Sequence, residues 1–317
     1  AERRQRADLL RMRDAQGYEA LVERAAYTWF NRLTAIRFME LNDRLPCHVR
    51  LLSSEDGSFR PQVLREALDV RIEGLDEEGV AALVAAGDDE ALFRMVLLAQ
   101  CRELSACLPD VFEPVGAPLE LLLPQGLLRS GSVIERLVDD IPEEDWRGGV
   151  EIVGWMYQYY ISERKDEVFA SFKKGKKADA GAIAPATQLF TPHWIVQYLT
   201  QNSLGRLWVQ TRPESALPSQ MPYYIPDDLG AEESDAASST VAEASEKGLP
   251  RAPETITVID PACGSGHILV YAFRLLAAMY EEAGYGRRDI PRLILRNNLT
   301  GCEIDPRAAQ IASFALA

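Results

Sequence analysis

Apolar residues recur at a helical spacing through the first 45 residues, and no proline interrupts them before Pro46. A repeat near 3.6 residues is typical of amphipathic helices. Trp29 and Phe30 are predicted to lie in the core, whereas Arg32 and Arg37 are predicted on a solvated helix face rather than at a DNA contact. The pattern predicts further helices between prolines, over residues 61–68, 77–86, 89–108 and 133–139. Residues 1–149 are therefore expected to form an all-α domain that holds no catalytic residue.

Residues 150–226 continue the helical pattern. A helix predicted over 150–172 carries a broad aromatic stripe, which is more often part of a core than a base-stacking surface. Thr191 is predicted to cap a helix over 193–204, with Pro192 in its first turn. Four lysines lie between these helices: Lys173, Lys174, Lys176 and Lys177. They are interpreted equally well as a solvated loop and as a contact with DNA phosphates.

Residues 227–254 are rich in Ala, Ser, Asp and Glu and poor in large apolar side chains. Such a composition buries too little apolar surface to offset the entropy of ordering the chain. We therefore expect a flexible acidic linker here. The regular apolar pattern resumes in the last segment, residues 255–317.

The segment that follows the linker predicts a strand, a tight loop and a helix. The β-branched run from Thr255 to Ile259 suits a buried parallel strand, and helical periodicity covers 268–276. Gly264 and Gly266 between them allow the backbone to turn and to approach a ligand closely. The pattern favours a cofactor cradle over its alternative, a plain strand-to-helix turn.

The acid at the mouth of this cradle indicates its ligand. Asp260 would repel a pyrophosphate but attract an ammonium group. Leu269 occupies the place of the third glycine in a dinucleotide-binding fingerprint, and no Gly-Lys-Ser/Thr follows. A ligand that carries an amino-acid zwitterion and a ribose fits better, and S-adenosylmethionine (SAM) is such a ligand.

A second apolar strand, predicted from Leu299, ends in two acids. Glu303 is assigned to the ribose hydroxyls, because a carboxylate at the tip of the second strand is the usual partner of a ribose diol. Ile304 is assigned to the adenine face. Asp305 is interpreted as a structural cap, with Pro306 at the start of the last helix. The interval from Asp260 to Glu303 is longer than in a minimal strand–helix–strand unit, and the extra residues, 282–298, predict one or two added helical turns.

Three motifs resemble those of the N6-adenine DNA methyltransferases: residues 189–192 resemble motif X, 260–266 motif I and 301–306 motif II. Their order is that of the gamma-type enzymes. The sequence at 154–163 and 187–196, together with 29–40, resembles the PglX methyltransferases of BREX phage-resistance systems.

The resemblance implies an α/β fold, in which an N-terminal all-α helical domain precedes the start of a Rossmann-like SAM-dependent methyltransferase domain. It also implies that motif X contributes Phe190 and Thr191 to the SAM site. The cofactor-binding residues expected from motifs I and II are Asp260, Pro261, Ala262, Cys263, Gly264, Gly266, Glu303 and Ile304. Expected partners are double-stranded DNA, held mainly by sequence beyond this chain, further BREX components, and a phage-encoded DNA mimic.

The motif that holds the flipped adenine in this family, Asn/Asp-Pro-Pro-Tyr/Phe, does not occur in the sequence. We therefore assign no catalytic residue, and we expect an N-terminal portion of a longer enzyme that is inactive by itself. Two alternatives stay open. One is the modification subunit of a restriction system, and the other is a SAM-dependent binding module that performs no chemistry.

Composition limits the remaining possibilities. A net charge of −14 is unfavourable for a protein that contacts DNA phosphates over a wide surface. No apolar run reaches the length of a membrane span, so a cytoplasmic protein without membrane contact is expected. Five cysteines without a C-x-x-C pair indicate free thiols and no metal site.

Overall fold

The computed structural model describes residues 2–112, 117–178, 180–189, 191–226 and 252–317. The predicted cofactor contact Phe190 and all but the last three residues of the predicted acidic linker, 227–254, lie outside the described residues. The chain divides into two compact units, Ala1–Met156 and Tyr157–Leu316. The four-part division predicted from the sequence stays a prediction.

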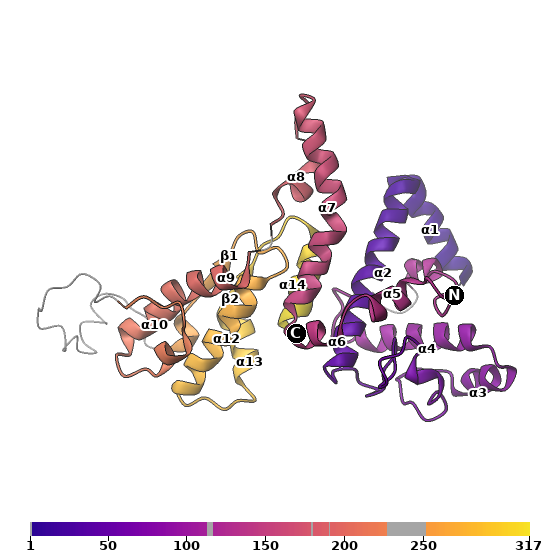
Figure 1. Cartoon of the computed structure of the whole chain (residues 1–317), viewed down its shortest axis with the longest axis horizontal. Helices are drawn as coiled ribbons and strands as arrows, with labels where there is room; N and C mark the ends of the chain where they lie inside the picture. Colours follow the sequence, from indigo (N-terminus) through magenta and orange to yellow (C-terminus); the bar gives the residue numbers. More distant parts are fainter. Residues whose placement is uncertain (1, 113–116, 179, 190, 227–251) are drawn as a thin grey trace, which may run out of the picture. The chain divides into compact units, whose positions relative to one another are not determined.

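Among its described residues the first unit contains helices joined by turns and loops, and no strand. The helices are α1 (Glu2–Gln16), α2 (Tyr18–Leu41), α3 (Glu77–Ala86), α4 (Asp89–Leu104), α5 (Val133–Asp139) and α6 (Glu143–Arg147), with 3₁₀ turns at Gln62–Leu64 and Pro118–Leu122. Gly17 separates α1 from α2 with a φ of 90°, and the two helices pack against each other (Figure 1). The helix predicted over 61–68 is wrong: only one 3₁₀ turn forms, and its backbone is held to the preceding loop, because Gln62 N donates to Ser53 O and Val63 N donates to Arg50 O.

The prediction that Arg32 and Arg37 are solvated is also wrong. Their exposed fractions are 1% and 0%. The Arg32 guanidinium lies over the Trp29 ring, 5.0 Å from its centroid, and Arg37 Nη1 donates to Glu40 Oε1 over 2.6 Å. A charged side chain is tolerated in a core when its charge is paired and its donors find acceptors.

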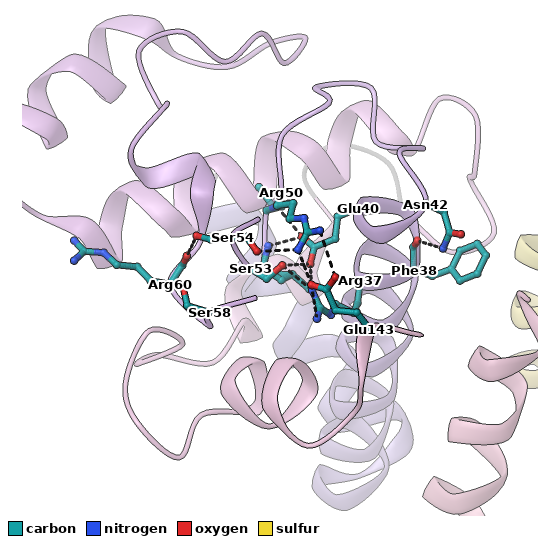
Figure 2. Close-up of polar contacts among 12 residues, drawn as sticks. Arg37, Phe38, Glu40, Asn42, Arg50, Ser53, Ser54, Ser58, Arg60 and Glu143 are labelled. Atoms are coloured by element: carbon teal, nitrogen blue, oxygen red, sulfur yellow. Dashed lines mark hydrogen bonds and ion pairs between the residues drawn. The ribbon is translucent and has the colours of Figure 1, made fainter. Parts of the chain in front are cut away.

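Figure 2 shows how the buried pair Arg37–Glu40 organises the loop after α2. Glu40 Oε2 accepts from the backbone N–H groups of Leu51 and Leu52 at 2.8 and 2.7 Å. Ser53 Oγ joins both partners, because it accepts from Arg37 and donates to Glu40. One buried carboxylate therefore fixes a loop more than ten residues away in the sequence.

The second unit begins within α7 (Glu151–Lys173). Its further helices are α8 (Ala180–Thr187), α9 (His193–Thr200), α10 (Arg206–Thr211), α12 (His267–Glu282), α13 (Ile290–Asn297) and α14 (Pro306–Leu316). A π-helical turn at Gln201–Gly205 joins α9 to α10, and 3₁₀ turns lie at Leu217–Gln220 and Pro253–Thr255. The predicted helix 193–204 thus ends four residues early as an α-helix, and its N-cap is Pro192 without a side-chain bond from Thr191.

Two short strands, β1 (Val258–Asp260) and β2 (Leu299–Gly301), form a parallel pair in the register Val258↔Leu299 and Asp260↔Gly301. The predicted first strand therefore starts later than expected, because Thr255 closes a 3₁₀ turn. In Figure 1 both strands lie beside α12, which also contacts α9, α13 and α14. α13 supplies the helical turns predicted between helix and second strand. The chain is thus mostly helical, with a small two-stranded parallel sheet in its described part.

The core of the second unit surrounds α12. Leu276, Met279 and Tyr280 of this helix are fully buried and pack with Trp208 of α10 and Ile294 of α13. At the end of α12 the Glu282 carboxylate accepts from Trp208 Nε1, Ser215 Oγ and the Ala216 N–H at 2.8, 2.7 and 2.9 Å. Partial burial raises the pKa of Glu282, but these hydrogen bonds outweigh it and the net pKa is lowered. The packing holds α12 firmly, and the candidate site lies at its other end.

Candidate cofactor site

The loops after β1 and β2 lie side by side at the carboxyl edge of the sheet. The strand ladder continues beyond its last register pair, because Cys302 N donates to Asp260 O at 2.8 Å and Cys263 N donates to Cys302 O at 3.0 Å. Ligands of open parallel sheets bind at this edge. The structure therefore brings the predicted motif I and motif II residues together although about forty positions separate them in the sequence.

Glu303 joins the two loops. Its Oε2 accepts from Gly264 N at 2.7 Å, and its Oε1 accepts from Asp305 N at 2.9 Å. A carboxylate offers about four lone-pair positions, so two backbone donors leave room for further hydroxyl donors. The arrangement fixes the orientation of the carboxylate that the sequence assigns to the ribose.

Asp260 shapes the entry to the glycine loop. Its Oδ1 accepts from Ala262 N at 3.2 Å, and the side chain is partly exposed. Pro261 and Ala262 are exposed, and Ile304 is 68% exposed on the neighbouring loop. A carboxylate and an apolar side chain are thus both open to a ligand at the edge of the sheet.

The two glycines of motif I are required for different structural reasons. Gly264 has a φ of 55° and Gly266 a φ of 83°, both in the region that side chains disfavour. A Cβ on Gly266 would lie 3.0 Å from Ala312 Cβ and 3.2 Å from Ala312 Cα on α14. Gly266 is therefore needed where the start of α12 meets α14, a reason that the sequence does not disclose.

Gly301 was missed by the sequence reasoning. A Cβ at this position would lie 2.8 Å from Leu269 Cδ1 and 3.1 Å from Cys263 Sγ. Leu269 stands where a dinucleotide fingerprint has its third glycine, whose role is close helix–strand packing. Here the strand supplies the small residue and the helix the large one. The signal that could have identified Gly301 in the sequence was a glycine at the last position of the second strand.

Cys263 has a hindered thiol. Burial, followed by the negative charges of Asp260 and Glu303, raises its pKa to about 11. The thiol is therefore protonated near neutral pH and is a poor nucleophile. The contact of Cys263 with a cofactor, which the resemblance implies, stays a prediction.

The segment with motif X leads to the same end of α12. The ring of His193, the first residue of α9, meets the Tyr271 ring edge-to-face at 6.0 Å, and Gln201 Nε2 donates to Tyr271 OH at 2.6 Å. Tyr271 lies in the second turn of α12, so both helices begin close to the glycine loop. Thr191, partly exposed, stands just before Pro192, the N-cap of α9. Free N–H groups at helix starts favour an anionic group such as a carboxylate.

Two buried polar side chains near these helix starts have no hydrogen-bond partner among the described residues. Ser265, in the glycine loop, is 2% exposed with an unpaired Oγ, and Gln188, just before motif X, is 8% exposed with both amide atoms unpaired. Buried polar atoms are rarely left unpaired in a folded protein. The Ser265 hydroxyl, in the glycine loop itself, is thus available to a polar ligand.

Other kinds of site receive no support from the part of the chain that the structure describes. No group of three or more His, Cys, Asp or Glu side chains in it could hold a metal ion. Among the same residues no helix is long and apolar enough to cross a bilayer.

Sequence comparison identifies related proteins. The chain is 49% identical over 98% of its length to the adenine-specific methyltransferase BrxX of Escherichia coli O9:H4 (strain HS). It is 41% identical over 93% of its length to the adenine-specific methyltransferase PglX of Lacticaseibacillus casei (strain Zhang). The chain spans 25% of the length of each relative. Residues 241–317 match the DNA-methyltransferase domain family of MmeI. The similarity to BrxX covers both units, and the family match covers motifs I and II of the candidate site.

Proposed function

Because this chain is homologous to the adenine-specific methyltransferases BrxX and PglX, we propose that the whole protein is a SAM-dependent DNA methyltransferase that modifies adenine at N6. We assign it to a bacterial phage-defence system of the BREX type, acting in the cytoplasm. The segment after β1 is proposed to begin a Rossmann-like methyltransferase domain, of which β1 and β2 are the first two strands.

The observation that carries this proposal is the bond between Glu303 and the glycine loop. A carboxylate at the tip of β2 that accepts from Gly264 N at 2.7 Å stands beside the loop that would hold the amino-acid part of SAM. A dinucleotide site would need a region free of acids for its pyrophosphate. Asp260 borders the glycine loop instead, which supports a ligand with an ammonium group, and Glu303 stands where a ribose would be held.

The proposed contacts divide among three segments. Asp260 would hold the ammonium group, Glu303 the ribose hydroxyls and Ile304 the adenine, while the start of α9 would face the carboxylate. The remaining proposed contacts are Phe190, Thr191, Pro261, Ala262, Cys263, Gly264 and Gly266. When bound, SAM supplies a methyl group on a sulfonium, which is attacked by the adenine amino nitrogen.

The acceptors that fix a flipped adenine are proposed to lie elsewhere in the whole protein. The sequence lacks the Asn/Asp-Pro-Pro-Tyr/Phe tetrapeptide, and the chain spans a quarter of its relatives. Holding both reactants accelerates a reaction only when they are aligned. Residues 1–317 alone are therefore proposed to bind SAM without methylating DNA. The proposed partners of the whole protein are double-stranded DNA, other BREX components and a phage-encoded DNA mimic.

The test of the proposed function is the state of genomic adenines in cells with and without the gene for the whole protein. We expect N6-methyladenine at one recurrent sequence only when the gene is present, read by a sequencing method that detects this base. A matched strain carries Asp260→Ala together with Glu303→Ala and should lose the mark. Unmodified adenines despite SAM binding by the purified protein would contradict the methyltransferase and favour a SAM-dependent binding module.

A further inference from the structure

Helix α7 contacts both halves of the candidate site. The Tyr157 hydroxyl donates to Asp305 Oδ2, two residues beyond Glu303. Lys165, two turns further along α7, donates through Nζ to the backbone oxygen of Gln188 at 2.9 Å, just before motif X. All four residues belong to the second unit. Tyr157, which the sequence reasoning did not single out, thus reaches the loop that carries Glu303.

The Tyr157 contact is buried. Tyr157 is 0% exposed and Asp305 is 7% exposed. A buried phenol and a buried carboxylate each need a partner, and a hydrogen bond to an ionised group is stronger than one between neutral groups. Removal of the hydroxyl would leave Asp305 Oδ2 without this donor.

Asp305 passes this constraint to the cofactor loop. Its Oδ1 accepts from Arg307 N at 3.0 Å and caps α14, while its own N–H donates to Glu303 Oε1 at 2.9 Å. Glu303 Oε2 in turn accepts from Gly264 N at 2.7 Å. A continuous series of hydrogen bonds therefore runs from Tyr157 through Asp305 and Glu303 to the glycine loop.

We propose that Tyr157 is a positioning residue for the cofactor: by holding Asp305, it sets the position of the Glu303 carboxylate beside Gly264. This inference rests on the proposed function. Tyr157 does not touch the cofactor, so its effect is transmitted and is smaller than that of Glu303. A carboxylate that binds two ribose hydroxyls must be held in position to about half an ångström. Greater mobility of Asp305 therefore lowers the affinity for SAM without abolishing binding.

The test is SAM affinity of the whole protein, measured by titration calorimetry, for Tyr157→Phe. Transmitted effects of this kind are modest, so the Kd for SAM should rise roughly three- to thirtyfold. Tyr159→Phe is the matched control, because Tyr159 lies on the same helix but is 78% exposed. This control should bind SAM as the wild type does.

A double-mutant cycle separates positioning from a general loss of structure. If Tyr157 acts through Glu303, the substitution Tyr157→Phe has no further effect on SAM affinity in the Glu303→Ala background. Equal losses in both backgrounds would overturn the proposal, and so would an unchanged Kd for Tyr157→Phe. A wild-type protein that does not bind SAM would instead refute the proposed function.

A second variant keeps the proposal testable if Tyr157→Phe does not fold. Asp305→Asn keeps the size of the side chain and an oxygen that can cap α14, but removes the charge to which Tyr157 donates. The Kd should again rise, and Glu303→Ala should again abolish the difference. Wild-type affinity in a folded Asp305→Asn protein would count against the assignment of Tyr157.

Discussion

Arg37 shows at the scale of the single residue how far a side chain's role depends on its surroundings. Its spacing in α2 resembles that of a solvated arginine, yet its exposed fraction is 0%. Glu40 lies one helical turn away and supplies the counter-charge, and Ser53 supplies a second acceptor. The loop that carries Ser53 is itself held by Glu40, so no short stretch of sequence contains the whole arrangement.

The two acids of the candidate site lead to a prediction at the same scale. Asp260→Ala removes the charge proposed for the ammonium group, and Glu303→Ala removes the proposed ribose acceptor. Loss of a hydrogen bond to a charged group costs about 1.5–3 kcal/mol, so SAM affinity should fall roughly ten- to a hundredfold in each variant. Calorimetry on folded protein measures it.

Asp289→Ala is the control for these variants. Asp289 is an exposed acid before α13 whose side chain does not cap that helix. Its removal should leave SAM affinity unchanged. Wild-type affinity in both Asp260→Ala and Glu303→Ala would refute the location of the site.

At the scale of the element, the sheet edge depends on two close approaches between helices and strands. α12 begins against α14 because Gly266 lacks a Cβ, and β2 lies under Leu269 because Gly301 lacks one. Both glycines therefore set the distance of α12 from its neighbours. This distance places the glycine loop beside Glu303.

Gly266→Ala should lower the free energy of unfolding for two separable reasons. A φ of 83° costs an alanine roughly 1–2 kcal/mol, and the new Cβ, 3.0 Å from Ala312 Cβ, adds about 1–3 kcal/mol of overpacking. Gly284→Ala is the matched control, because Gly284 has a φ of 86° and nothing within 4 Å of the added Cβ. Denaturant unfolding of both variants should show the larger loss for Gly266→Ala, and equal losses would contradict the packing role.

At the scale of the whole molecule, charge is the property that sets the interaction with DNA. A net charge of −14 disfavours non-specific binding along the whole surface. Lys173, the last residue of α7, and Lys174, Lys176 and Lys177 directly after it are all exposed. Through Tyr157 the same helix reaches the loop that holds Glu303. A phosphate contact at the lysines would thus be made by an element of the cofactor unit.

Replacement of the four lysines by Gln tests this contact in the whole protein. If they touch phosphates, affinity for duplex DNA should fall, and the slope of log affinity against log salt should flatten by about one unit per lost contact. Exposed arginines elsewhere, changed to Gln, give a control with the same loss of charge: Arg3, Arg4, Arg6 and Arg129. If the salt slopes of the two variants agree, the lysines do not contact phosphates and form a solvated loop.

The sequence by itself determined the elements whose signals are local. The bounds of α3 and α5 follow from apolar spacing and from their caps, Asp76 and Ser132, each of which accepts from the backbone three residues on. The order of strand, glycine loop and helix in motif I, and the capping role of Asp305, were predicted for the same reason. Periodicity and capping act within a few residues, so a single sequence displays them.

Only the tertiary structure decided which distant groups meet. Glu303 bonds to Gly264 across 39 positions, and Tyr157 bonds to Asp305 across 148. Gly301 makes room for Leu269, and Arg37 is buried because a loop folds back over α2. The assignment of Glu303 and Gly264 to SAM stays a prediction from motifs, whereas the contact between them comes from packing. Burial and pairing depend on the partner that the folded chain brings within a few ångströms, and that partner has no fixed sequence separation.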